Sequence, residues 1–169
     1  MTNLDDHEAP RIVSESSDSA PRFPNRLPGA SSPAAQQRMR ATRQRDTKPE
    51  RLLCEQLDRL GLAYTTNQSP MPGFRRHADV CCSAERVAVF VDGCFWHGCP
   101  QHGTLPKANH DWWKAKIDAN QWRDANTNRT LEQSGWIVLR FWEHEPADKA
   151  ARVIANVVGC RRLDPSFEI

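Results

Sequence analysis

Apolar residues recur at helical spacing in the first part of the chain that has a regular pattern. Between residues 47 and 61 they are Leu52, Leu53, Leu57 and Leu60. Thr47 can cap a helix there, Pro49 falls in the first turn, where its missing N–H costs nothing, and Gly61 supplies a stop. The pattern therefore predicts an amphipathic helix that carries Cys54 on its flank as a small apolar group.

Short runs of strand-forming residues follow this helix. Residues 62–66 predict one short strand, residues 69–73 a Pro-Gly turn, and a second strand begins close to Asp79. After a tight turn at residues 85–86, the continuous apolar run at residues 87–91 predicts a buried strand. Asp79 then lies on the preceding arm of a hairpin, twelve positions before Val91. Cys81 and Cys82 must point to opposite faces of their strand, and we assign both to the core.

The C-terminal half again alternates helix and strand. A long helix is predicted at residues 111–133, with an interruption near residues 126–128 and an end at Gly135. Its apolar positions are Trp112, Trp113, Ile117, Trp122 and Leu131. A buried strand at residues 136–142 ends just before His144, and a last helix covers residues 147–158. This order predicts an α/β fold, a mixed sheet flanked by helices, with polar groups collected at the strand ends.

Composition divides the 169 residues into one domain and two tails. Only 38% of the residues are hydrophobic and the mean hydropathy is −0.71, so part of the chain contributes no core. We assign residues 1–36 to a disordered tail rich in Ser, Pro and acids, residues 37–160 to the domain, and residues 161–169 to a C-terminal tail. A basic arm at residues 37–46 opens the domain, and it is either a solvated linker or a DNA contact through Arg38, Arg40, Arg43 and Arg45.

Charge and cysteine content limit the partners and the cellular compartment that we expect for the protein. The net charge is only +2, so the total does not indicate a polyanionic partner. No apolar run approaches the roughly 18 residues of a membrane span, and no signal peptide is visible. We therefore expect a monomeric cytoplasmic protein with reduced thiols, in which clustered Cys and His residues favour metal binding over disulfides.

Four Cys and His residues have side chains that suit zinc. Cys94, Cys99 and His102 lie within one loop after the strand at residues 87–91, and His144 follows a separate buried strand. A structural zinc site takes four such ligands in a closed tetrahedron. The spacing differs from that of a zinc finger, and the alternative is that the cysteines only fill space while the histidines lie on the surface.

Acidic residues near the same loop suit hydrolysis. Asp79 and Asp92 could hold a hard cation such as Mg²⁺ through oxygen, and His97 could activate water as a general base. Glu50 could orient that histidine or a metal-bound water. A metal ion and a base beside a phosphodiester are the elements of a nuclease. The alternatives are purely structural: a turn acid, an acid at a strand end, and an acid placed by the helix dipole.

Several separated blocks carry a resemblance to a known family. In order they are MRATRQRDTKPE, a Pro-Gly loop with an Asp-Val strand, VFVDGCFWHGCP, WW-x-x-K-I-x-x-N-x-x-R-D, and GW-x-V-L-R-x-W-E-H-E. Together they resemble the very short patch repair (Vsr-type) DNA mismatch endonucleases across about residues 38–145. The resemblance implies a restriction-endonuclease-like fold and bacterial, nucleoid-associated DNA repair. It implies a Mg²⁺-dependent nick 5′ of the thymine in a T·G mismatch left by deamination of 5-methylcytosine. Duplex DNA with that mismatch would be the partner, alongside other repair proteins.

The resemblance also assigns roles to individual residues. Asp79 matches the metal-binding aspartate, His97 the catalytic histidine, and Glu50 the acid that assists it, while Val91 stands where a main-chain oxygen helps hold Mg²⁺. The structural Zn²⁺ ligands fall on or beside Cys94, Cys99, His102 and His144. The aromatic residues that wedge into DNA match Phe95, Trp96 and Trp113. The arm that embraces DNA matches the segment that begins at Arg38.

Two departures keep other functions in view. His77 and Ala78 precede Asp79 where a proline is expected, and Asp92 lacks the following lysine of the usual PD-(D/E)xK nuclease signature. Either His97 takes the role of that lysine or the metal ion supplies a larger part of the catalysis. Asp92 either binds metal or positions DNA. The competing functions are a nuclease of the same fold that cuts matched DNA and a zinc-stabilised DNA-binding module without catalysis. Packing in the core is the competing role for Trp113.

Overall fold

The computed structural model describes residue 37, residues 46–164 and residues 166–167. Its elements are α2 (Lys48–Arg59), β1 (Thr65–Gln68), β2 (Ala78–Cys82), β3 (Val87–Asp92), α3 (His110–Glu132), β4 (Ile137–Trp142) and α4 (Ala147–Leu163). The predicted N-terminal tail lies outside the described residues, as do the arginines of the basic arm, Arg38, Arg40, Arg43 and Arg45.

The strands form one mixed sheet in the order β1-β2-β3-β4. The first three strands are antiparallel, and β4 pairs in parallel with β3, so that Asp92 lies opposite Trp142. The connection between β3 and β4 is the loop at residues 93–109 followed by α3. Because parallel strands end at the same edge of a sheet, the residues after β3 and after β4 emerge side by side. The expected α/β fold with a mixed sheet is confirmed.

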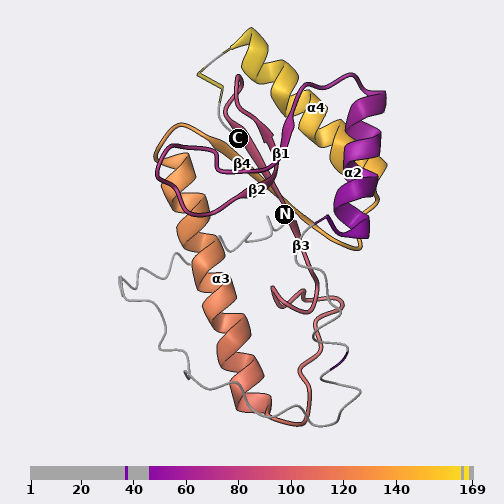
Figure 1. Cartoon of the computed structure of the whole chain (residues 1–169), viewed down its shortest axis with the longest axis vertical. Helices are drawn as coiled ribbons and strands as arrows, with labels where there is room; N and C mark the ends of the chain where they lie inside the picture. Colours follow the sequence, from indigo (N-terminus) through magenta and orange to yellow (C-terminus); the bar gives the residue numbers. More distant parts are fainter. Residues whose placement is uncertain (1–36, 38–45, 165, 168–169) are drawn as a thin grey trace, which may run out of the picture.

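The helices cover both faces of the sheet. Figure 1 shows α2 beside α4, with α3 on the other side of the sheet. The α2 and α4 side buries a core that includes Leu53, Val89 and Ile154, and the α3 side buries Phe90 and Leu131. Cys82 belongs to the first cluster and Cys81 to the second, and each is about 1% exposed, which confirms that both are core residues.

The structure corrects three predicted boundaries. The first strand begins at Thr65, because Leu62 and Tyr64 pack against the core before it, and the Tyr64 hydroxyl donates to Oδ1 of Asp58 at 2.8 Å. Helix α3 runs through residues 126–128 without interruption. Helix α4 extends beyond residue 158, because the buried Arg161 donates from Nη2 to the main-chain oxygen of Gly135 at 2.6 Å.

The continuity of α3 has a local cause. The hydroxyl of Thr127 donates to the main-chain oxygen of Arg123, and that of Thr130 to the oxygen of Asn126, both at 2.7 Å. The side-chain oxygens of Asn126 and Asn128 accept hydrogen bonds from arginines outside the helix. Residues that compete with helical hydrogen bonds in isolation are therefore satisfied here by tertiary partners. In the part of the chain that the structure describes, no helix is long and apolar enough to cross a membrane.

Candidate active site and metal centre

Asp79 is held at the meeting point of β2 and β3. Its Oδ2 accepts the main-chain N–H of Val91 at 2.7 Å, which joins the two residues that the hairpin spacing predicted would be close. Burial, together with the negative charges of Glu50 and Asp92, raises the pKa of Asp79 to about 6, against the effect of the Val91 hydrogen bond. A cation that binds beside such a carboxylate stabilises its charged form.

A cavity of about 230 Å³ opens beside Asp79. It is lined by residues from α2, the β1–β2 connection, the end of β3, α3 and β4, which are Glu50, Arg76, His77, Asp79, Phe90, Val91, Asp92, His97, Arg123, Asp124, Thr127 and Arg140. Glu50 reaches it from the first turn of α2, where its Oε1 accepts the Thr47 hydroxyl at 2.8 Å. The structure therefore brings every residue proposed for catalysis or Mg²⁺ binding into one cleft.

His97 is paired with an acid that the sequence reasoning missed. Its Nδ1 lies 2.6 Å from Oδ2 of Asp124 on α3 and 3.6 Å from Oδ1 of Asp92. The sequence contains a signal for Asp124, which is a row of polar residues on one helix face. Asn120, Asp124 and Thr127 are spaced by four and three positions, which places them on the same side of a helix. Asn120 and Thr127 are buried, so this polar face points into the protein.

Asp92 is engaged by Arg140, a second residue that the sequence reasoning missed. Nε of Arg140 donates to Oδ2 of Asp92 at 2.7 Å, and Nη2 donates to Oδ1 at 2.5 Å. The same Nη2 lies 3.1 Å from Oδ1 of Asp124, and the guanidinium carbon lies 4.9 Å from the centre of the Phe90 ring. Burial alone would lower the pKa of Arg140, but the bonds to Asp92 raise it. A metal ion at Asp92 would therefore compete with Arg140 for the same two oxygens.

The four residues predicted to bind zinc lie together. One ligand atom from each of Cys94, Cys99, His102 and His144 lies within 4.8 Å of the others. Sγ of Cys94 is 3.1 Å from Nδ1 of His144, and Sγ of Cys99 is 3.9 Å from Nδ1 of both His102 and His144. Zinc bonded to sulfur and nitrogen at its usual lengths separates such atoms by about 3.5 Å. The donor set and its spacing therefore fit a tetrahedral zinc ion.

Backbone hydrogen bonds shape the loop that carries three of these ligands. The N–H of Cys99 donates to the oxygen of Cys94 at 2.9 Å, and the N–H of Cys94 donates to Oε1 of Glu143 at 2.7 Å. Burial raises the pKa of the Cys99 thiol, but the N–H groups of the residues that follow it outweigh this effect and lower the pKa. Glu143 thus ties the loop after β3 to the end of β4, beside His144.

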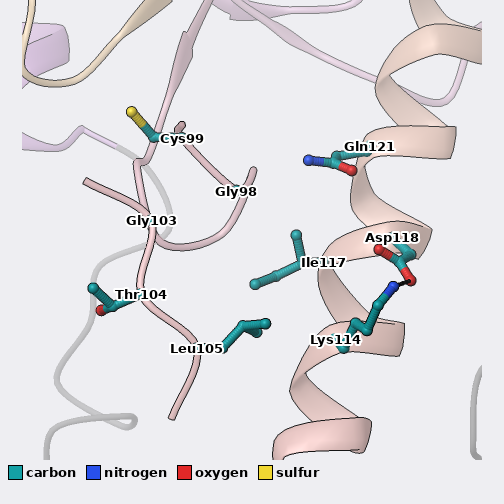
Figure 2. A pocket seen from close by; sticks show the side chains of 9 residues that line it. All are labelled: Gly98, Cys99, Gly103, Thr104, Leu105, Lys114, Ile117, Asp118 and Gln121. Carbon is teal, nitrogen blue, oxygen red and sulfur yellow. Dashed lines mark hydrogen bonds and ion pairs between the residues drawn. The ribbon is translucent and has the colours of Figure 1, made fainter. Parts of the chain in front are cut away.

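The other side of this loop rests on α3. Figure 2 shows Ile117 and Gln121 pointing from α3 towards the loop, whereas Sγ of Cys99 points away from the helix. A cavity of about 230 Å³ remains between the loop and α3, and its lining includes the Lys114–Asp118 ion pair at 2.7 Å. Gly98 has a φ of +68°, and a Cβ there would lie 2.9 Å from Cγ2 of Ile117. The close contact between the loop and α3 therefore requires glycine at this position.

Three aromatic residues predicted to wedge into DNA form one cluster. The ring centres of Phe95 and Trp96 are 5.1 Å apart, and Trp113 lies 5.2 Å from Phe95 and 5.9 Å from Trp96. All three side chains are half-buried, and Trp112 stacks edge-on against Trp113 at 4.8 Å. The cluster joins the loop immediately before His97 to the first turns of α3.

The chain is similar to proteins of a known family. Residues 32–102 match the family model described as DNA mismatch endonuclease Vsr. The type II nicking enzyme V.NaeI of Lentzea aerocolonigenes is 38% identical over 132 residues, which cover 77% of this chain and 78% of that protein. The type II nicking enzyme V.XorIIP of Xanthomonas oryzae pv. oryzae is 35% identical over 115 residues, which cover 67% and 82%. The DNA mismatch endonuclease Vsr of Escherichia coli strain K12 is 35% identical over 108 residues, which cover 62% and 66%.

The family match covers Glu50, Asp79 and the loop as far as His102. The fold expected from the resemblance, a restriction-endonuclease-like α/β domain, agrees with the mixed sheet and its flanking helices. On these grounds the chain belongs to the Vsr family of DNA mismatch endonucleases and is a DNA endonuclease.

Proposed function

We propose that the protein nicks duplex DNA on the 5′ side of the thymine in a T·G mismatch, in a Mg²⁺-dependent reaction that starts repair of deaminated 5-methylcytosine. The observation that carries this proposal is the placement of two features on one loop. His97, which lines the cleft with Asp79, directly follows Phe95 and Trp96 of the aromatic cluster. A loop of this kind couples opening of a base step to cleavage close by.

Asp124 orients His97 and selects the tautomer in which it can act as a general base. When Nδ1–H of His97 donates to Oδ2 of Asp124 at 2.6 Å, Nε2 is left as the acceptor that takes a proton from the attacking water. The carboxylate also stabilises the imidazolium that forms, as an acid does in a catalytic triad. Arg140 bridges Asp124 and Asp92, so it keeps both acids in place behind the histidine.

Asp79 and the main-chain oxygen of Val91 are the groups that would hold Mg²⁺, with Glu50 as the neighbouring acid. Asp79 uses Oδ2 to accept the Val91 N–H, and Mg²⁺ prefers oxygen ligands of this kind. When bound, the ion supplies positive charge against the oxygens of the phosphodiester. Asp79 fixes the position of that charge at the junction of β2 and β3.

The aromatic cluster is suited to sensing a mismatch. Inserting Phe95, Trp96 and Trp113 beside a base pair costs a few kcal/mol of unstacking, and a mispaired step is easier to open than a matched one. Selectivity then comes from the deformability of the DNA as well as from hydrogen bonds. Cys94, Cys99, His102 and His144 would hold a structural Zn²⁺ that keeps this loop in shape.

Nicking of a defined duplex tests the proposal. Duplexes with one T·G pair in a library of flanking sequences are incubated with and without Mg²⁺, beside the matched duplexes and with His97→Ala as the inactive control. We expect nicks 5′ of the mismatched thymine only with Mg²⁺ and only with the unaltered protein. Equal cleavage of matched and mismatched duplexes would instead identify a nuclease for matched DNA, and no nick in any context would refute the proposal.

A further inference from the structure

Two arginines on the wall of the active-site cleft are hydrogen-bonded to neutral amides rather than to acids. Arg76 belongs to the connection between β1 and β2, and Arg123 to the middle of α3, yet both line the cavity that contains Asp79 and His97. Arg140, the third arginine of this cavity, pairs with the carboxylates of Asp92 and Asp124, and these contacts explain its position. The contacts of Arg76 and Arg123 are different.

Both arginines are held by neutral side-chain amides. Nη1 of Arg76 donates to Oδ1 of Asn126 at 3.1 Å, and Nη2 of Arg123 donates to Oδ1 of Asn120 at 2.8 Å. Among the described residues, neither arginine has an ion pair with a carboxylate. Asp124 attracts Arg76 at longer range, but its two oxygens already face His97 and Arg140. The amides fix the direction of each guanidinium without neutralising its charge.

The two positive charges also oppose each other. Burial lowers the pKa of Arg76, and the charge of Arg123 lowers it further. Burial lowers the pKa of Lys116, about two helical turns earlier on α3, and the charge of Arg123 lowers it further. Arginine remains protonated at neutral pH even so, so the free protein retains this repulsion. An anion placed between Arg76 and Arg123 would relieve it.

The surroundings identify the anion. Asp79 and Glu50 bring negative charge to this cavity, where a cation would bind, and Arg76 and Arg123 bring positive charge to the same cavity. A DNA strand that presents one phosphodiester to Asp79 must carry its next phosphates across this wall. Guanidinium groups match phosphate oxygens in geometry and charge.

We propose that Arg76 and Arg123 form a phosphate fork that grips the backbone of the nicked strand next to the bond that is cut. The inference rests on the proposed function, since it takes the cleft as the place where the strand is cut. A bound phosphate would add a second link between α3 and the β1–β2 connection, which the hydrogen bond from Arg76 to Asn126 already joins. It positions the strand and does not take part in proton transfer.

The salt dependence of DNA binding tests the fork. Affinity for a fluorescent duplex with one T·G pair is measured at several salt concentrations without Mg²⁺, for the unaltered protein, Arg76→Gln and Arg123→Gln. Each substitution should lower the slope of log affinity against log salt by about 1. Arg152→Gln is the matched control, because Arg152 is an exposed arginine on α4 that pairs with Asp148 at 3.6 Å. It should leave the slope unchanged.

Two further variants separate charge from folding. Arg76→Lys and Arg123→Lys keep the charge and should keep the slope, and the thermal stability of the glutamine variants should match that of the unaltered protein or exceed it. Slopes for both glutamine variants equal to that of Arg152→Gln would overturn the fork, as would lysine variants that lose as much slope as the glutamine variants. If the protein nicks mismatched DNA while these slopes stay constant, only the fork fails. If the slopes fall but no duplex is nicked, the proposed function fails and phosphate binding stands.

Discussion

At the scale of single residues, Asp79 sits where its negative charge is disfavoured. Its pKa of about 6 in the folded protein exceeds the value of about 3.9 expected in an unfolded chain. As pH rises from about 4 to about 6, the unfolded chain releases this proton first, so the contribution of Asp79 to stability falls over that window. At neutral pH the negative charge of Asp79 therefore lowers the stability of the fold, at the place where the proposed Mg²⁺ would bind.

Asp79→Asn should therefore raise stability while it removes activity. Asparagine keeps an oxygen that can accept the Val91 N–H, but it carries no charge. In urea unfolding at pH 7 without Mg²⁺, we expect the free energy of unfolding to rise on the order of 1–2 kcal/mol, and nicking to be lost. At about pH 4 the difference in stability should vanish. A variant that is less stable at pH 7 than the unaltered protein would contradict this account.

Sequence reasoning found some residues of the cleft and missed others for a physical reason. The contact between Asp79 and Val91 followed from a hairpin, whose turn length fixes which residues face each other. The polar stripe on α3 indicates only that Asp124 shares a helix face with Asn120 and Thr127. Its contact with His97 depends on the rotation of α3, and the contact of Arg140 with Asp92 depends on the parallel pairing of β4, so no local pattern encodes either contact. The predicted roles of Glu50 and Asp92 stay predictions, although both residues line the cleft.

At the scale of elements, α3 supports the loop that carries Trp96 and His97. Nδ2 of Asn120 donates to the main-chain oxygen of Trp96 at 2.7 Å, and Nε2 of Gln121 donates to that of His97 at 3.1 Å. The helix therefore fixes the backbone at the aromatic cluster and at the proposed general base. Asp124, one turn after Asn120, then fixes the imidazole ring.

Gly98→Ala should disturb this support. A Cβ at Gly98 would lie 2.7 Å from Nε2 of Gln121 and 2.9 Å from Cγ2 of Ile117, so the loop must move away from α3. Because misplacing a catalytic group by about 1 Å can cost on the order of 100-fold in rate, we expect nicking to slow by roughly 10- to 100-fold. The control is Gly61→Ala, where φ is +67° and no atom lies within 4 Å. Equal loss of activity in both variants would show that only backbone strain matters.

Elements differ in how well sequence predicts them. The apolar run of β3 and the signals at the ends of α2 were sufficient, since both are local features of the sequence. Thr47 stands at the N-cap as expected, but its hydroxyl donates to Glu50 and makes no hydrogen bond to the helix backbone. The start of β1 was misplaced because its four residues are all exposed and give no apolar pattern. The predicted break in α3 was wrong because Asn126 and Asn128 find arginine partners that lie far away in sequence.

At the scale of the whole molecule, the Cys/His cluster joins two segments that are distant in sequence. Cys94, Cys99 and His102 come from the loop after β3, whereas His144 follows β4. A metal ion there would lock the parallel pair of strands at the edge where the cleft opens. The same edge carries the Glu143 hydrogen bond to the N–H of Cys94.

Purified protein should contain about one zinc per chain, and His144→Ala should lose it. We expect this variant to lose about 2 kcal/mol of stability, or roughly 5–10 °C in Tm. Metal analysis and thermal unfolding measure the two effects. His110→Ala is the control, because His110 lies at the start of α3 with a half-exposed side chain and outside the cluster. Unchanged Tm in His144→Ala, or clearly less than one zinc in the unaltered protein, would contradict a zinc site.

The parallel pairing of β3 and β4 has a consequence for the protein during its synthesis. Asp79 and His97 leave the ribosome well before Asp124, and Arg140 emerges later still. The crossover through α3 must be made before β4 can join the sheet. Until β4 has paired, Asp92 and Asp124 lack the guanidinium that holds them, and His144 is absent from its cluster. A growing or interrupted chain therefore carries no assembled nuclease, and the genome is exposed to cutting only by molecules that have completed the sheet.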